Sequence, residues 1–391
     1  MADITLLATA DWDYPIWTNK QHVACSFADL GHRVLYVESL GLRPIRLTRG
    51  AGRGDFRRIL QRLCHGFRPP RRVRDNIWIW SPIVLPGVNQ GWRLWLNRIS
   101  LWIGLRWARF CSGMQADLLW TYNPLTLAIL AIKPYGRLVY HCVDSIQSQP
   151  GMPASAIQSW EQLLCSKADA VFVTSPQLRR DLAHLNANTY FYPNVADSEH
   201  FAGAMSSLTH EASDLASIPR PRIGFVGAVS AYKLDLDLVH QLAKSHPQWS
   251  FVLVGPVGEG DPATDVKALS ELSNVFLLGE RPYRDLPCYL KGFDIGLLPL
   301  RHNDYTRSMF PMKFFEYLAA GLPVVSTDID ALQGFAHLAC LVPPKYDSFD
   351  SAICEVLAGG GPSKAQRLAG VAGQTYLARS EAMLKRLWGQ A

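Results

Sequence analysis

The sequence lacks the signatures of several common classes of site. Its eight cysteines are scattered without a Cys-x-x-Cys pair, so neither a zinc site nor a disulfide framework is indicated, and a reduced cytosolic setting fits best. Gly-x-Gly-x-x-Gly and the Walker lysine are both missing, which disfavours a dehydrogenase and a P-loop NTPase. Helix-turn-helix, zinc-finger and RNA-binding patterns are also missing, which disfavours nucleic acid as a partner.

Long hydrophobic runs and a leader segment are likewise missing. No stretch reaches 18 apolar residues without a charge, which excludes an ordinary membrane-spanning helix. The opening, Met1 to Asp13, carries three aspartates and no basic segment, so it does not have the pattern of a signal peptide. The chain of 391 residues is 48% apolar and 18% charged, which is enough for two or three domains with cores of their own.

Positive charge and tryptophan are concentrated in the first half. Residues 1–200 hold 22 basic and 14 acidic side chains, whereas residues 201–391 hold 17 and 19. Eleven arginines lie between Arg43 and Arg74 with one acid, Asp55, and nine of the twelve tryptophans lie in the first 120 residues. We therefore expect the first half to face an anionic membrane surface, with Arg43 to Arg74 as the main contact.

A helical stretch, Trp92 to Phe110, is the other candidate for that contact. One face of its helical wheel carries large apolar side chains: Trp92, Trp95, Leu96, Ile99, Trp102, Ile103, Trp107 and Phe110. Arg98, Arg106 and Arg109 lie at or beside the edge of this face, which is typical of an interfacial helix. A second apolar strip, formed by Leu94, Leu101 and Leu105, slightly favours a helix that is buried on both sides.

Short apolar runs alternate with helical patterns along the chain. They predict strands at 4–8, 33–38, 117–120, 137–142, 170–174, 188–192, 223–226, 251–254, 275–278, 295–298 and 324–326. Strands separated by helices indicate an α/β fold with parallel sheets covered on both faces. A Ser-, Ala- and Pro-rich segment near residue 210 indicates a linker. We predict two Rossmann-like domains whose sheets face a crevice, with the boundaries 1–200, linker 201–221, 222–374, and a C-terminal helix, 375–391, that returns to the first domain.

The most informative stretch covers residues 310–327, FPMKFFEYLAAGLPVVST. It predicts a two-turn helix that starts near Lys313 and ends at Gly321. Lys313 and Glu316 are three residues apart and share a face of that helix. A helix N-terminus with a lysine suits a diphosphate, and a carboxylate one turn later can accept hydrogen bonds from ribose hydroxyls. The alternative is an ordinary helix with a surface ion pair.

This stretch resembles the nucleotide-sugar segment of GT-B glycosyltransferases, Pro-x-Lys-x-x-Glu-Tyr-Leu-Ala-x-Gly-x-Pro-Val-Val. The chain as a whole resembles the bacterial exopolysaccharide and teichuronic-acid branch of that family. Tyr192 to Asp197 with His200-Phe201 is similar to its interdomain segment, and Arg222 to Gly227 to the first strand of its donor domain. Gly279 to Pro287, with Tyr283, is similar to the strand and helix before the donor site. The resemblance covers nearly all of the chain and is weakest at residues 40–115.

The resemblance implies donor-binding roles for a group of residues in the second half: Gly227, Lys233, Tyr283, Met312, Lys313 and Glu316. Met312 would lie near uracil and Lys313 near the phosphates. Lys233 stands where related enzymes place a phosphate-contacting lysine, although Ala228 replaces the arginine that usually accompanies it. Taken without the family, Lys233 is equally well a solvated loop lysine.

The stereochemistry stays open between two templates. Many retaining GT-B enzymes carry Glu-x7-Glu, whose second glutamate matches Glu316 and whose first falls at Ser308 here. Pro311-Met312-Lys313 instead resembles the Ser-Met-Lys of the membrane-associated glucuronosyltransferase of xanthan assembly, an inverting enzyme. We therefore expect inversion, with retention as the alternative.

An inverting transfer needs a base, and Asp144 is the predicted one. A strand runs into Asp144, and the xanthan enzyme has a similar strand that ends in its catalytic aspartate. Such a base takes the proton of the acceptor hydroxyl as that hydroxyl attacks the anomeric carbon. An aspartate at the end of a strand is also commonly a helix N-cap.

The first loop carries the residues that we expect on the acceptor side: Asp13, Trp17, Lys20 and His22. His22 is equally explained as a hydrogen-bonded histidine of the following helix. Asp-x-Asp occurs three times in unrelated contexts, so it does not predict a metal site. Cationic side chains and helix dipoles can stabilise a leaving diphosphate, so we expect neither a metal nor another cofactor.

Together these expectations describe a glycosyltransferase at the inner face of the cell membrane. It would be a cytoplasmic, peripheral protein that transfers a sugar from a nucleotide sugar, expected to be a UDP-sugar, to a lipid-linked saccharide or polysaccharide. Two alternatives stay open, a nucleotide-sugar 2-epimerase and a two-lobed sugar-binding protein without chemistry.

Overall fold

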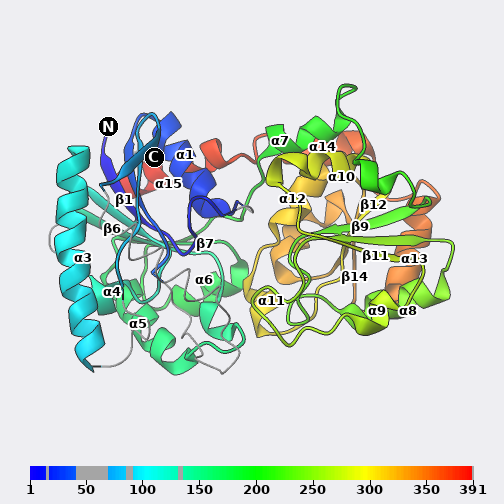
Figure 1. Cartoon of the computed structure of the whole chain (residues 1–391), viewed down its shortest axis with the longest axis horizontal. Coiled ribbons are helices and arrows are strands. Elements are labelled where there is room, and N and C mark those ends of the chain that lie inside the picture. Colours follow the sequence, from blue (N-terminus) through cyan, green and yellow to red (C-terminus); the bar gives the residue numbers. More distant parts are fainter. Residues whose placement is uncertain (15–16, 41–68, 85–90, 131–134, 390–391) are drawn as a thin grey trace. The chain divides into compact units, whose positions relative to one another are not determined.

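The computed structural model describes residues 1–14, 17–40, 69–84, 91–130 and 135–389 (Figure 1). The chain forms two compact units. The first unit consists of Met1–Thr174, Leu178–Tyr192 and Arg379–Ala391, and the second of Ser175–Gln177 and Pro193–Ala378.

The first unit is built on a sheet with the strand order β3-β4-β2-β1-β5-β6-β7-β8. Its strands are β1 (Asp3–Leu7), β2 (Arg33–Val37), β3 (Arg71–Arg74), β4 (Ile77–Trp80), β5 (Leu118–Thr121), β6 (Arg137–Cys142), β7 (Ala170–Val173) and β8 (Thr189–Phe191). All neighbouring strands are parallel except β3 and β4. Most of the parallel strands are continuously buried, as expected for a sheet that is covered on both faces. The order reverses at β1, which lies between β2 and β5.

Helices cover this sheet. They are α1 (Asn19–Asp29), α3 (Gly91–Ser112), α4 (Thr126–Ile129), the 3-10 helix η1 (Ile146–Ser148), α5 (Ala154–Lys167), α6 (Pro176–Leu182) and α15 (Tyr376–Trp388). Leu101 and Leu105 of α3 and Leu164 of α5 belong to one apolar core with strand residues such as Leu119. Residues from Arg379 onward belong to this unit, where the Arg137 guanidinium donates to the Leu387 carbonyl at 2.9 Å.

The second unit has a fully parallel sheet with the order β11-β10-β9-β12-β13-β14. Its strands are β9 (Arg222–Val226), β10 (Ser250–Val254), β11 (Val275–Gly279), β12 (Ile295–Leu298), β13 (Val324–Thr327) and β14 (Cys340–Val342). This is the doubly wound order of a Rossmann fold, with the switch point between β9 and β12. Ligands of such sheets bind at the carboxyl ends of the strands beside the switch point.

The helices of the second unit are mostly short. They are α7 (Ser198–Ala202), η2 (Gly203–Met205), η3 (Ser213–Leu215), α8 (Leu236–Ser245), α9 (Lys267–Ser270), η4 (Tyr283–Asp285), α10 (Leu286–Lys291), α11 (Asp304–Ser308), α12 (Met312–Ala319), η5 (Asp330–Leu338), α13 (Tyr346–Leu357) and α14 (Lys364–Val371). The segment expected as a linker, 201–221, is part of this unit. Ala204, Leu215 and Ile218 are buried in its core, so the first unit ends earlier than predicted, at Tyr192.

Every strand predicted from the sequence is present, whereas three strands were not predicted. β3 and β4 form a hairpin whose turn contains Asn76 with a φ of 63°. β3 reads Arg-Arg-Val-Arg, so it has no apolar run to reveal it. The third, β14, is a short edge strand whose three residues are only half-buried.

The expectation that α3 is buried on both sides was wrong. Leu101 and Leu105 are buried, but Trp92, Trp95 and Phe110 are exposed. The larger arginine-rich candidate, 43–74, lies mostly outside the described residues. Its last three arginines form surface ion pairs: Arg71 with Asp13, Arg72 with Asp75 and Arg74 with Asp29.

Candidate functional site

Glycines follow the carboxyl ends of β9, which borders the switch point of the second unit, and of its neighbour β10. Gly227 follows β9 with a φ of 146°, and Gly255 follows β10 with a φ of 147°. A Cβ atom at Gly255 would lie 2.0 Å from the Gly227 carbonyl oxygen, so the two turns can stack only without a side chain there. A Cβ atom at Gly227 would lie 3.0 Å from Cε of Lys313. The end of β9 is therefore bare backbone beside a lysine, which suits close approach by an anion.

Helix α12 is held in place against β9 and β12. Its buried face includes Phe314, Phe315 and Leu318. The Tyr317 hydroxyl accepts a hydrogen bond from the Val226 backbone N–H at 2.8 Å. The Tyr317 ring fills the space that a side chain at Gly296 of β12 would need, where a Cβ atom would lie 2.4 Å from the ring. These contacts fix the N-terminus of α12, and with it Lys313, beside the end of β9.

Lys313 and Glu316 form an ion pair with Nζ and Oε1 3.9 Å apart. The exposed fraction of the side chain is 26% for Lys313 and 5% for Glu316. Burial raises the pKa of the Glu316 carboxyl, and the positive charges of Lys313 and His200 oppose that rise. The surface ion pair considered from the sequence is therefore wrong for Glu316, because its carboxylate is buried. A buried carboxylate with a single loose ion pair can accept hydrogen bonds from a ligand.

His200 and Tyr283 are electrostatic neighbours of that carboxylate. Their rings are stacked with centroids 4.4 Å apart, and Nε2 of His200 lies 3.0 Å from the Tyr283 carbonyl oxygen. The Asp197 carboxylate accepts from the His200 backbone N–H at 3.2 Å. Burial raises the pKa of Tyr283, and the negative charges of Glu316 and Asp197 raise it further. Three separate segments thus meet around Glu316, and His200, which we did not predict as a site residue, is one of its neighbours.

The two remaining donor-side candidates have aromatic neighbours. The Tyr376 hydroxyl lies 3.8 Å from Sδ of Met312, within hydrogen-bond range of sulfur. Nζ of Lys233 lies 5.1 Å from the ring centroid of Tyr232 and 5.5 Å from that of Tyr305. Cation–π contact therefore holds the Lys233 ammonium in place, and the solvated loop lysine considered from the sequence is too simple a description.

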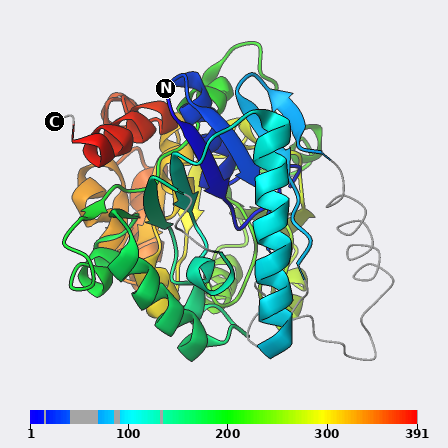
Figure 2. The same cartoon turned by 90° about the vertical axis from the view of Figure 1, so that its left-hand side faces the viewer.

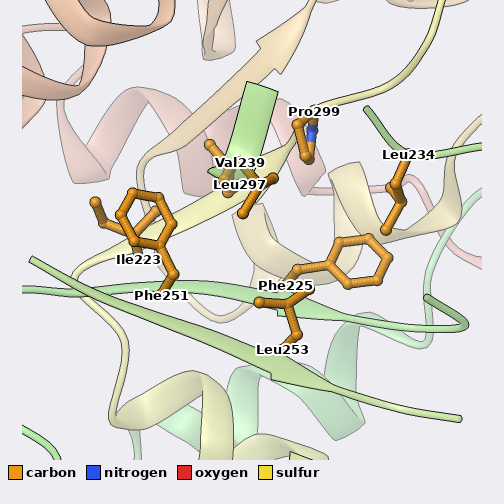
Figure 3. Close-up of a pocket in the computed structure, with 8 residues that line it drawn as sticks. All are labelled: Ile223, Phe225, Leu234, Val239, Phe251, Leu253, Leu297 and Pro299. Atoms are coloured by element: carbon orange, nitrogen blue, oxygen red, sulfur yellow. The ribbon is translucent and has the colours of Figure 1, made fainter. Parts of the chain in front are cut away.

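An apolar pocket in this unit is a packing space rather than a nucleotide site (Figure 3). It is lined by Ile223, Phe225, Leu234, Val239, Phe251, Leu253, Leu297 and Pro299. These side chains offer no hydrogen-bond donor or acceptor for a phosphate or a sugar. All of them except Pro299 belong to the apolar core between the sheet and its helices.

In the first unit, Asp144 follows β6 and is half-buried. The N-cap of the next helix, η1, is Ser145, so the structure does not place Asp144 at the N-cap position. The backbone around Asp144 is held by side chains: Thr174 Oγ1 donates to the Val143 carbonyl at 2.8 Å, and Cys142 Sγ lies 3.7 Å from the Asp144 carbonyl. This leaves the carboxylate at the carboxyl end of a central strand, where a base is expected.

The acceptor-side candidates do not form one cluster. Trp17 packs edge-on against His22 with ring centroids 5.3 Å apart, and buried Lys20 lies 5.6 Å from the Tyr122 ring centroid. Asp13, in contrast, is 73% exposed and paired with Arg71 at 2.6 Å. The structure therefore groups Trp17 with His22, and Lys20 with Tyr122, and it places Asp13 in a surface ion pair.

His141 of β6 was not predicted as a site residue. Its ring lies 4.8 Å from that of Tyr122, and its Nδ1 has no hydrogen-bond partner among the described residues. Burial, together with the charges of Lys20 and Arg379, lowers the pKa of His141 to about 3. An unpaired, neutral ring nitrogen at the end of a strand can hydrogen-bond a ligand.

Two kinds of feature are absent from the described part of the chain. Within it, no three His, Cys, Asp or Glu side chains are arranged to hold a metal ion. None of the helices there combines the length and the apolar character that crossing a membrane requires.

The comparisons with known proteins show what the second unit is similar to. Residues 220–359 match the family Glycosyl transferases group 1. The matched residues include all six donor-side candidates, from Gly227 to Glu316. A relative in Bacillus subtilis is TuaH, which is assigned to teichuronic acid biosynthesis as a glycosyltransferase. TuaH is 28% identical over 232 residues, which are 56% of this chain and 57% of TuaH, so the match spans little more than half of each protein.

Solved structures confirm the predicted GT-B fold. Sucrose-phosphate synthase from Thermosynechococcus elongatus superposes with a TM-score of 0.71 at 15% identity, with both chains fully covered. HepE from Anabaena, solved with UDP and glucose, superposes with a TM-score of 0.65 at 15% identity, again with both chains covered in full. At such low identity these likenesses establish the α/β architecture of two Rossmann-like units and no more.

Proposed function

We propose that this protein is a glycosyltransferase of the Leloir type, which transfers a hexosyl or glycuronosyl group from a nucleotide sugar. The observation that carries the proposal is the placement of Lys313, paired with buried Glu316, beside the bare backbone of Gly227 at the switch point of the second sheet. The glycosyl transferases group 1 match over the same residues supports it. We further propose a UDP-sugar as donor, because HepE, which shares the fold, was solved with UDP and glucose.

In this proposal the donor's diphosphate lies at the N-terminus of α12. The helix dipole and the Lys313 ammonium would neutralise it, and the bare Gly227 backbone would allow its approach. The Glu316 carboxylate would accept hydrogen bonds from ribose hydroxyls, and Met312 would contact the uracil. These groups supply the stabilisation of a leaving diphosphate, so the proposal needs no metal or other cofactor.

The proposed chemistry is a single displacement with inversion. The acceptor hydroxyl oxygen bonds to the anomeric carbon as the bond from that carbon to the diphosphate oxygen breaks. The Asp144 carboxylate takes the hydroxyl proton, and the diphosphate leaves with both electrons of the broken bond. Glu316 has no glutamate partner at Ser308, which supports inversion over the retaining alternative. The anomeric configuration of the product, read by NMR, decides between them.

The proposed acceptor is a lipid-linked saccharide or polysaccharide at the inner face of the cell membrane, reached from the cytoplasm. The relationship to TuaH supports an envelope polysaccharide, and the uneven charge of the sequence supports an anionic membrane surface. The seven cysteines among the described residues are free, in keeping with a reducing compartment.

The donor site is tested by calorimetric titration of UDP into the folded parent and variants. Loss of one charge-assisted contact to a diphosphate costs about 1.5–3 kcal/mol, so Lys313→Ala or Glu316→Ala lowers UDP affinity by about ten- to a hundredfold. The matched control is Lys244→Ala, which removes an exposed lysine of α8 and leaves the affinity unchanged. Unchanged affinity in both site variants would overturn the assignment. A thermal-shift screen of UDP-, GDP- and dTDP-sugars then identifies the nucleobase of the donor.

A further inference from the structure

Helix α3 presents its largest apolar side chains to solvent. The exposed fraction is 64% for Trp92, 61% for Trp95, 48% for Trp102, 54% for Ile103 and 84% for Phe110. At about 100° per residue, these five side chains lie within one arc of the helix. The opposite arc, which contains Asn97, Leu101, Leu105, Ala108 and Ser112, is buried. The helix is thus apolar on both sides. Trp92, Trp95 and Trp102 are turned away from the core of the first unit, whereas Trp107 packs against it.

Specific contacts fix this orientation. Gly104 packs against Trp80 of β4 so closely that a Cβ atom would lie 2.4 Å from the indole. The Arg98 Nε donates to the Ala128 carbonyl at 2.6 Å, and the Ser100 hydroxyl donates to the Ile83 carbonyl at 2.7 Å. The helix therefore cannot rotate to bury its tryptophans without breaking these contacts. Figure 2 shows α3 in cyan, running across the front of the first unit.

The charge of α3 has one sign. Its 22 residues include four arginines and no acidic residue. The guanidinium of Arg106 lies 4.5 Å from the Trp102 ring centroid, and that of Arg93 lies 5.4 Å from the Trp92 ring centroid. Cationic groups beside exposed indoles are complementary to a surface whose interior is apolar and whose outer layer is anionic.

We propose that α3 lies in the plane of an anionic membrane, with Trp92, Trp95, Trp102, Ile103 and Phe110 at the boundary between headgroups and acyl chains. The inference rests on the proposed function, since it names the surface through which the enzyme would reach a lipid-linked acceptor. A second copy of this chain fits the surface poorly. A twofold interface would bring together Arg93 and Arg106 of the two helices, which lie beside exposed tryptophans, and α3 has no acidic residue to pair with them.

Flotation of the full chain with lipid vesicles tests the proposal. The chain binds vesicles of phosphatidylcholine mixed with phosphatidylglycerol far better than vesicles of phosphatidylcholine alone, and salt weakens the binding. Trp95→Ser and Trp102→Ser each lower the vesicle partition coefficient by about tenfold or more. Leu163→Ser and Leu208→Ser are matched controls, because they remove apolar side chains that are exposed elsewhere, and they leave the coefficient unchanged.

The charge on α3 is tested separately. Arg106→Gln lowers the partition coefficient by about fivefold on anionic vesicles and has little effect on neutral ones. The matched control is Arg179→Gln, which replaces an exposed arginine of α6 and leaves the partition coefficients on both kinds of vesicle unchanged. Thermal melting verifies that each variant is folded, which is expected because the substituted side chains are exposed.

The possible results separate this proposal from its rivals. Vesicle binding that survives the paired substitution of Trp95 and Trp102 overturns the assignment to α3. A parent that is dimeric by light scattering, and becomes monomeric with the same substitutions, overturns it in favour of a second copy. Loss of vesicle binding with normal UDP affinity supports α3 as the contact and leaves the donor site intact. A parent that binds vesicles through α3 but does not bind UDP refutes the proposed function alone.

Discussion

The two units differ in how far apart along the sequence their buried polar side chains lie. In the second unit, buried Glu316 and its cationic partner Lys313 belong to the same helix, and the bare backbone of Gly227 lies beside Lys313. In the first unit the buried polar side chains, such as Lys20 and His141, come from distant parts of the chain and lie among aromatic rings. A site made by one helix leaves a contiguous sequence motif, whereas a site assembled from several strands and helices leaves isolated residues. The proposed donor side could therefore be predicted from one contiguous motif, whereas the proposed acceptor side rests on isolated residues.

The largest expected effect tests whether the first unit contributes chemistry. Asp144→Asn keeps the shape of the side chain but cannot take a proton, so turnover falls by about 10²–10⁴-fold while UDP affinity stays within a factor of about two. Single-turnover transfer measured beside UDP titration provides the two readouts.

The matched control for Asp144 is Asp75→Asn. It removes the carboxylate charge from an exposed ion pair with Arg72, so turnover stays close to that of the parent. Near-normal transfer by Asp144→Asn would move the base to another residue, with Asp13 and His22 next in line, or would favour a retaining mechanism.

An intermediate effect separates the two glycines that follow β9 and β10. Gly255→Ala places a Cβ atom against the Gly227 carbonyl oxygen, so we expect it to cost about 3 kcal/mol or more of stability. Gly227→Ala costs about 1–3 kcal/mol because of its backbone conformation and also displaces Lys313, so the folded variant binds UDP more weakly.

Gly334→Ala is the control for both glycine variants, since a Cβ atom there has nothing within 4 Å. Denaturant unfolding and UDP titration on all three variants measure the two effects. A Gly227→Ala variant with lower stability and unchanged UDP affinity would mean that this glycine shapes the fold and not the site.

The smallest expected effect is a difference in how the two units respond to acid. His141 has a folded-state pKa of about 3, below its unfolded value, so the unfolded chain binds a proton first as the pH falls through about 6.5. The free energy of unfolding therefore decreases by about 2 kcal/mol between pH 7 and pH 5 on account of this group. Glu316 acts in the opposite sense, because its raised pKa lets the folded state bind the proton first.

Unfolding at pH 7 and pH 5 tests this difference. His141→Phe keeps an aromatic ring among its neighbours and reduces the decrease in the free energy of unfolding between pH 7 and pH 5. Glu316→Gln makes that decrease larger. An unchanged acid response in His141→Phe would show that the histidine is not buried in its neutral form.

The sequence predicted the strand succession and helix α12 because both depend on local patterns. Strands such as β9 and β10 are short apolar runs between helices, and α12 carries its lysine, glutamate and closing glycine within ten residues of chain. It did not predict the β3–β4 hairpin, because arginines occupy most of β3. It misjudged α3, because a helix with two apolar faces does not reveal which face a sheet covers. It missed His200 and His141, whose neighbours are set by tertiary packing.

The turn at Gly227 also bears on how such a site can be mapped. A scan that truncates side chains measures what each removed atom contributes, and it finds residues like Lys313. Gly227 has no side chain to remove, and its contribution is the volume that it leaves empty beside Cε of Lys313. Only a scan that adds atoms, one methyl group at a time, reports on that volume. At strand ends of this kind, we expect substitutions that add side-chain volume to identify the residues next to a ligand better than substitutions that remove side-chain volume.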